Sequence, residues 1–175
     1  MGLDMYLNKK LYVRPKSIYL TDMDLETKVL ANGVEYSKFN PKNVTYVMEE
    51  VADWRKFNAL HFWFVKNVQQ GNDDCEEYEV TLAHFKKLQE CLDLIVETSV
   101  NCLRNKITIS ERDEICRKEF PPTEGFFFGS TAIDEYYFED VVSTKRIIGG
   151  IIDEIEQSII DGDSVLIDYF YQSSW

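Results

Sequence analysis

Residues 3–13 read Leu-Asp-Met-Tyr-Leu-Asn-Lys-Lys-Leu-Tyr-Val. Leu3, Met5 and Leu7 alternate with more polar neighbours, and a period of two residues is typical of a strand with one buried face. A second stretch that favours a strand, residues 165–171, lies near the other end of the chain. The sequence therefore predicts a strand at each end of the chain.

Further strands are predicted between residues 30 and 52. Asn32-Gly33 is a turn signal, and residues 34–39 follow it with β-favouring side chains. Residues 44–51 place Val44, Tyr46 and Met48 on one face of a third candidate strand.

The first helical pattern spans residues 53–69, with Asp53 as its expected N-cap. An apolar stripe recurs there with helical spacing, and Trp63 lies opposite that stripe. We expect this helix either to lie buried between layers or to present a second face to a partner. The stripe consists of Trp54, Phe57, His61, Phe64, Val65 and Val68.

Two longer helices follow, over residues 81–103 and 132–160. Thr81 is the expected N-cap of the first, and Thr131-Ala-Ile-Asp134 resembles a capping box for the second. In the second helix, apolar residues recur every three or four positions from Tyr137 to Ile159. Residues 104–120 are charged and ambiguous, and they could hold a short helix.

These elements predict an α+β fold, because strands at both ends flank three main helices without regular βαβ alternation. We expect a mostly antiparallel sheet packed on helices. The chain has 175 residues and shows no repeat or linker, so residues 1–175 are predicted to form a single domain.

Charge and composition exclude several classes of protein. The net charge is −12 and aromatic residues make up 14% of the chain, so neither disorder nor direct binding to a nucleic-acid backbone is expected. Residues 151–175 contain no Lys or Arg. That acidic segment could imitate the phosphates of DNA, or it could simply keep the surface soluble.

Targeting and metal signals are not expected either. The chain has no secretory signal and no run of 18 apolar residues, which favours a cytoplasmic protein without a membrane span. Because no secretory signal is seen, we expect its four cysteines to be reduced thiols. They form no CxxC pair, so no zinc site is expected. The acidic residues match no metal-binding motif, and no cofactor is predicted.

The candidate site combines polar and aromatic residues. His61 and its neighbour Asn58 could present hydrogen-bonding groups from the first helix, or His61 could be a satisfied core residue. A His/Cys pair could activate Cys75, although the acidic residues Asp73 and Asp74 just before it oppose a thiolate. The Gly-Ser-Thr loop before the last helix could bind an anion. The candidate residues are Asn58, His61, Asp73, Cys75, Tyr78, Phe127, Phe128, Ser130, Tyr136, Tyr137, Tyr171 and Trp175.

Several motifs together resemble a family of small acidic proteins encoded by bacteriophages and prophages. They are Gly2-Leu-Asp-Met-Tyr-Leu7, Asn58-Ala-Leu-His61-Phe-Trp-Phe64, Gly71-Asn-Asp-Asp-Cys75-Glu-Glu-Tyr78, Gly125-Phe-Phe-Phe-Gly-Ser130 and Tyr171-Gln-Ser-Ser-Trp175. The resemblance covers nearly the whole chain and implies an accessory protein that acts in a bacterial cytoplasm. It assigns no catalytic residue.

Three functions remain open. The first is a non-enzymatic binding protein that counters a host defence system by binding a nucleotide-like signal or a host protein. The second is a small enzyme in which His61 acts as general acid or base near Asp73 or Cys75. The third is a structural or morphogenetic protein with Phe62, Trp63 and Trp175 at its interface, and a homo-oligomer is one form open to it.

Overall fold

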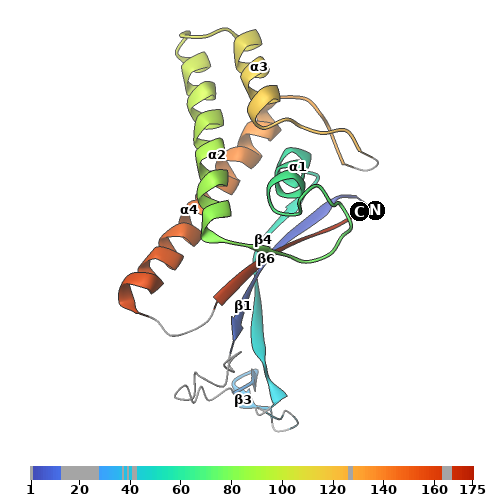
Figure 1. Ribbon diagram of the computed structural model, residues 1–175, viewed down its shortest axis with the longest axis vertical. Coiled ribbons are helices and arrows are strands. Elements are labelled where there is room, and N and C mark those ends of the chain that lie inside the picture. The colour runs from blue at the N-terminus through green and yellow to red at the C-terminus, as the bar shows by residue number, and fades with distance from the viewer. Residues whose placement is uncertain are drawn as a thin grey trace.

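A four-stranded antiparallel sheet with the order β4-β1-β6-β5 lies at the centre of the computed structural model (Figure 1). Its strands are β1 (Asp4–Tyr12), β4 (Tyr46–Arg55), β5 (Tyr78–Val80) and β6 (Ile167–Ser174). The helices are α1 (Asn58–Asn67), α2 (Leu82–Leu103), α3 (Ile109–Glu119) and α4 (Glu135–Asp161), and β2 (Leu30–Ala31) and β3 (Val34–Glu35) form a separate hairpin. The structure describes residues 2–12, 28–36, 38, 40, 43–125, 128–162 and 167–175. The predicted α+β class is confirmed.

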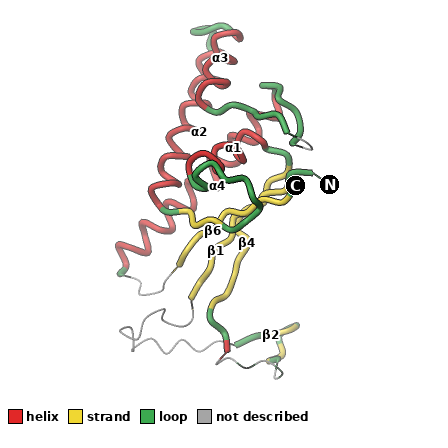
Figure 2. The backbone as a smooth tube through the Cα atoms, turned by 45° about the vertical axis from the view of Figure 1, so that its right-hand side comes forward, coloured by secondary structure: helices red, strands yellow, loops and turns green. Residues whose placement is uncertain are grey.

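β1 is an inner strand of the sheet, and its buried residues alternate as the sequence predicts. Leu3, Met5 and Leu7 are fully buried. Leu7 lies opposite Ala52 of β4 and Tyr171 of β6, so the first strand joins an early strand to the last one. The two ends of the chain consequently lie close together (Figures 1 and 2).

The helices contact one face of the sheet. The indole Nε1 of Trp54 in β4 donates to the hydroxyl of Thr144 in α4 over 2.9 Å. Phe64 of α1 stacks on Tyr171 of β6, with ring centroids 3.9 Å apart. α2 reaches the same face through an edge-on contact of Phe85 with a β6 tyrosine. Sheet and helices thus share one hydrophobic core.

The predicted start of the first helix is wrong. Asp53 lies within β4 rather than at an N-cap, and α1 begins only at Asn58 after Phe57. The spacing of three residues between Trp54 and Phe57 suits a helix, which is why the pattern placed both in one. In the structure Trp54 instead belongs to β4 and packs on the core from the sheet. Lys56 separates the two elements with a left-handed φ of 60°.

The other helix starts differ in how well they were predicted. Thr81 caps α2 as expected, with His84 as the reciprocal member of a capping box. The ambiguous stretch 104–120 contains α3, which Thr108 and Glu111 cap in the same way. In α4 the predicted Thr131 capping box is wrong, because the Asp134 carboxylate itself accepts from the Tyr137 amide over 3.1 Å.

The strand boundaries also shift. The strand predicted over 34–39 shrinks to β3, with Phe39 outside the described residues, and the one predicted over 44–51 extends through Arg55. β5 is missed because three residues are too few to show a period of two. β6 continues past Tyr171 to Ser174, while residues 165–166 lie outside the described part of the chain. No helix among the described residues is both long and apolar enough to cross a membrane.

Replacing Asp134 by Ala is expected to lower the free energy of unfolding by about 1 kcal/mol, because the N-terminus of α4 loses its side-chain acceptor. Urea unfolding followed by circular dichroism measures the change. Thr131→Ala is the matched control and should have an effect below about 0.5 kcal/mol. A larger loss of unfolding free energy in Thr131→Ala than in Asp134→Ala would favour the capping box predicted from the sequence over the Asp134 cap.

Candidate functional site

Segments that are distant in sequence meet at the end of the sheet that holds both termini. They are α1, the turn over residues 71–77, the loop over residues 128–130 and the end of β6. Seven of the twelve candidate residues are brought together there: Asn58, His61, Asp73, Phe128, Ser130, Tyr171 and Trp175. We call this group the His61 cluster.

His61 lies at the centre of the cluster with 2% of its surface exposed. Its Nε2 lies 3.1 Å from Oδ2 of Asp73, and its Nδ1 lies 2.9 Å from the hydroxyl of Tyr171. A carboxylate can only accept, so the tautomer that satisfies both contacts has its proton on Nε2, with Nδ1 accepting from the Tyr171 hydroxyl. Nε1 of Trp175 donates to the second oxygen of Asp73 over 3.1 Å. Both nitrogens of His61 are thus occupied within the protein.

Tyr171 is fully buried beneath this network. Burial, and to a lesser extent the negative charge of Asp73, raise the pKa of Tyr171 well above its ordinary value. The phenol therefore stays protonated and serves as a permanent donor to His61. A general acid or base must come within about 3 Å of a reacting atom, and neither buried group offers such access.

Asn58 ties two loops to the first turn of α1. Its amide nitrogen donates to the carbonyl oxygens of Phe128 (3.1 Å) and Ser130 (2.9 Å), and its Oδ1 accepts from the Thr123 amide over 3.0 Å. The Phe128 ring then packs edge-on against His61 at 5.1 Å. Asn58 is 2% exposed and acts as a clamp whose hydrogen bonds are all made inside the protein.

The remaining candidates lie beside the cluster or away from it. The carbonyl oxygen of Cys75 accepts from Gln172, and the Tyr78 hydroxyl donates to Asp74, so both residues fasten the turn to the sheet. Tyr137 instead donates to the Phe120 carbonyl in the core, and Tyr136 is exposed on α4. Phe127 lies outside the described residues.

Backbone strain concentrates around the cluster. Lys56, Gln70 and Cys75 have φ values of 60°, 56° and 61°, in the left-handed region that side chains disfavour. Gly129, at φ 95°, lies against Lys56, where an added Cβ would come within 3.0 Å of the lysine Cβ. Strained residues persist where the surrounding contacts hold them, and such strain gathers at functional sites.

A cleft of about 380 Å³ lies on the other side of α1, between α1, α2 and the end of α3. Phe62, Trp63 and Lys66 of α1 line it together with Lys87 of α2 and Lys118 of α3. We call it the lysine cleft. The sequence offered one signal for it, the second apolar face of the first helix, but not the partner helices. Ala59, Asn67, Glu90, Cys91, Leu94, Glu119, Phe120 and Pro121 complete its lining.

The side chains of the lysine cleft are partly fixed. The Nζ of Lys87 donates to Oδ1 of Asn67 over 2.7 Å, and the Asn67 amide donates to the Trp63 carbonyl over 2.8 Å. Trp63 itself is buried, so at this residue the second apolar side of the helix packs within the protein, while Phe62 stays half-buried beside it. Burial raises the pKa of the Cys91 thiol to about 11, so a reactive thiolate is not available there at neutral pH.

Comparisons with known proteins assign no family. No protein-family model matches the chain, and searches of curated proteins and of solved structures found no match. Among the residues that the structure describes, no three His, Cys, Asp or Glu side chains are grouped so that they could hold a metal ion.

Replacing Tyr171 by Phe is expected to lower the free energy of unfolding by about 1–3 kcal/mol, because Nδ1 of His61 loses its donor inside the core. Urea unfolding gives the difference. Tyr136→Phe on the exposed face of α4 is the control and should change stability by less than about 0.5 kcal/mol. Equal stability of Tyr171→Phe and the wild type would show that the bond to His61 contributes nothing.

Stability is also expected to fall as the pH rises above about 10. Burial raises the pKa of Tyr137, Tyr169 and Tyr171 in the folded protein, whereas the unfolded chain releases these protons near the ordinary tyrosine pKa. The unfolded state then binds fewer protons, so the free energy of unfolding decreases with pH. Urea midpoints measured between about pH 8 and about pH 11 test this. A flat profile would contradict the assigned burial of the phenols.

Proposed function

We propose that the protein is a phage-encoded, non-catalytic binding protein whose ligand is a nucleotide-like anion held in the lysine cleft. The observation that carries the proposal is the convergence of Lys66, Lys87 and Lys118 on one aromatic-lined cleft. The chain as a whole carries a net charge of −12, so this is an unusual place for three cations to meet.

Electrostatics favours the lysine cleft over the His61 cluster for an anionic ligand. The turn beside His61 carries Asp73, Asp74, Glu76 and Glu77, which would repel a phosphate. The lining of the lysine cleft includes three lysines and two glutamates, Glu90 and Glu119, and the Lys118 ammonium pairs with Glu119 over 2.8 Å. Lysine binds phosphate as a point charge, and the Asn67 amide oxygen already holds the Lys87 ammonium group over the cleft.

The rest of the cleft suits a planar ring. Phe62 is half-buried and Leu94 is 41% exposed, so both offer apolar surface to a base, while buried Trp63 supports them. Every nucleobase has a π-face, which makes stacking on such surface possible. A volume of about 380 Å³ lies within the usual range of about 300–1,000 Å³ for small-molecule sites.

The alternative of a small enzyme receives less support. It requires His61 to exchange a proton with a substrate, whereas both ring nitrogens are bonded to Tyr171 and Asp73. In our proposal the His61 cluster positions α1, from which Phe62 and Lys66 project into the lysine cleft. A role against a host defence system in the bacterial cytoplasm rests on the sequence resemblance together with a nucleotide-like ligand.

Isothermal titration calorimetry at low salt with the four common ribonucleoside diphosphates tests the proposal. At least one should bind with a Kd below about 1 mM, and more tightly than its nucleoside or inorganic pyrophosphate alone. The double variant Lys66→Glu/Lys87→Glu should weaken binding at least about tenfold, since one ammonium–phosphate contact contributes about 1.5–3 kcal/mol.

Lys106→Glu is the control for a single charge reversal of the same kind, because Lys106 lies in the α2–α3 connection outside the lysine cleft. It should leave the Kd within about twofold. Native mass spectrometry of the protein purified from a bacterium supplies a second readout. The proposal is wrong if no nucleotide binds and the spectrum shows only the mass of the polypeptide, or if Lys106→Glu weakens binding as much as the double variant.

A further inference from the structure

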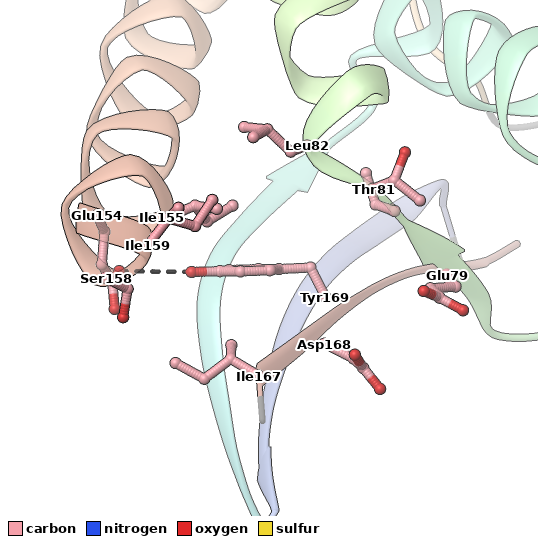
Figure 3. Close-up of a pocket in the computed structure, with 11 residues that line it drawn as sticks. Glu79, Thr81, Leu82, Glu154, Ile155, Ser158, Ile159, Ile167, Asp168 and Tyr169 are labelled. Atoms are coloured by element: carbon pink, nitrogen blue, oxygen red, sulfur yellow. Dashed lines mark hydrogen bonds between the residues drawn. The ribbon is translucent and has the colours of Figure 1, made fainter. Parts of the chain in front are cut away.

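A separate cleft of about 310 Å³ opens where the second half of α4 passes the edge of the sheet (Figure 3). We call it the edge cleft. Its walls come from the end of β5, the first residues of α2, the second half of α4 and the start of β6. They are Glu79, Val80, Thr81, Leu82, Glu154, Ile155, Ser158, Ile159, Ile167, Asp168 and Tyr169.

The floor of the edge cleft is apolar and fixed. In Figure 3, the Tyr169 ring projects from β6 toward α4, with Leu82 of α2 and Ile155 of α4 on one side of it and Ile167 on the other. Tyr169 is 3% exposed, and its hydroxyl donates to Glu154 over 3.4 Å. The Tyr169 ring is therefore held in place as part of the floor, because its hydroxyl is already bonded to Glu154.

The apolar stripe of α4 continues beyond the core that it covers. Tyr137 to Ile151 are buried along the stripe, yet Ile159 is 66% exposed at the lip of the edge cleft, and the adjacent Ile160 is 76% exposed. Two isoleucines at the end of a helix are costly to leave in water, at about 25 cal/mol for each Å² of apolar surface. Their exposure marks a surface suited to covering by an apolar group.

The end of α4 is also strongly negative. The last turn contains no basic residue, and the carboxyl end of any helix carries a partial negative charge. Asp153, Glu154, Glu156 and Asp161 add carboxylates along the same half of the helix, and Glu79 adds one from β5. Carboxylates near the C-terminus of a helix repel its partial negative charge and destabilise the helix. A cation from a binding partner would therefore be favoured there.

Two lysines of the chain form ion pairs with part of these carboxylates. Lys9 of β1 pairs with Glu154, and Lys86 of α2 pairs with Glu156 over 2.7 Å. Both come from the body of the protein, and neither belongs to the lining of the edge cleft. Among the described residues, the edge cleft therefore has an apolar floor, and carboxylates of α4 and β5 surround it. We call these carboxylates the acidic margin.

We propose that the edge cleft binds a basic segment of a partner protein. One large aliphatic or aromatic side chain of that segment enters between Ile155, Ile159 and Tyr169, and flanking Lys or Arg side chains lie against Glu79 and the acidic end of α4. This site is distinct from the lysine cleft and goes beyond the nucleotide-like ligand proposed for it.

Charge complementarity selects this occupant. A second copy of the chain would bring another net charge of −12, and a nucleic acid or an anionic membrane would be repelled for the same reason. A small amine lacks the apolar body that would cover Ile159. A segment with an apolar anchor and basic flanks can cover the apolar floor and pair with the surrounding carboxylates at the same time.

Three synthetic peptides test the proposal by nuclear magnetic resonance of ¹⁵N-labelled protein at low salt. The first is Gly-Lys-Lys-Leu-Lys-Lys-Gly, the second replaces its Leu by Gly, and the third replaces every Lys by Glu. The first should shift the amide signals of residues 154–159 and 167–169. The second should bind at least about tenfold more weakly, and the third should not bind.

Variants of α4 then locate the site. Ile159→Lys should weaken binding of the first peptide at least about tenfold, because it removes apolar surface and adds a like charge. Val142→Lys, at another exposed position earlier on α4, should leave binding within about twofold. Circular dichroism checks that both variants remain folded.

Four outcomes would overturn the proposal. They are equal binding of the Leu and Gly peptides, unchanged binding by Ile159→Lys, shifts confined to residues outside the edge cleft, and concentration-dependent broadening of the cleft signals without peptide. The last would assign the surface to a second copy. Nucleotide titration of Ile159→Lys should match the wild type, so failure here leaves the lysine cleft separately testable.

Discussion

The pairing of β1 with both β4 and β6 is the constraint on which the rest of the structure depends. β1 opens the chain and β6 closes it, so the sheet is complete only when residues more than 150 positions apart have met. Fully buried Leu7 holds this junction between Ala52 and Tyr171. Closing such a long loop costs chain entropy, which the burial of the shared core must offset.

The same pairing creates the His61 cluster. It carries Tyr171 under α1 and brings Trp175 to Asp73, so a buried histidine finds a partner for each ring nitrogen. A polar network of this kind stabilises a fold only when every member is bonded, because an unpaired buried group costs about 1–3 kcal/mol. We therefore interpret the cluster as the junction that positions α1, with left-handed Lys56 and Cys75 as its local cost.

Helices on one face of the sheet leave two different clefts. α1 is buried on both sides, and its outer side meets α2 and α3 to form the lysine cleft. α4 extends beyond the core and forms the edge cleft with β5 and β6. The two sites carry opposite charge, since three lysines line the first and carboxylates surround the second. In our two proposals, one small domain thus binds an anionic ligand at one cleft and a basic segment at the other.

Local patterns in the sequence determined the strand at residues 3–13, the capped helix from Thr81 and the long stripe of α4, because periodicity and capping depend on neighbouring residues alone. They also identified His61, Asp73, Tyr171 and Trp175 as candidates. Only the tertiary structure decided that Trp54 belongs to β4 and that the Tyr137 hydroxyl bonds within the core, because each depends on a partner distant in the chain. The lysine cleft was hidden for the same reason: Lys66, Lys87 and Lys118 come from three helices, and no spacing within one segment records their meeting.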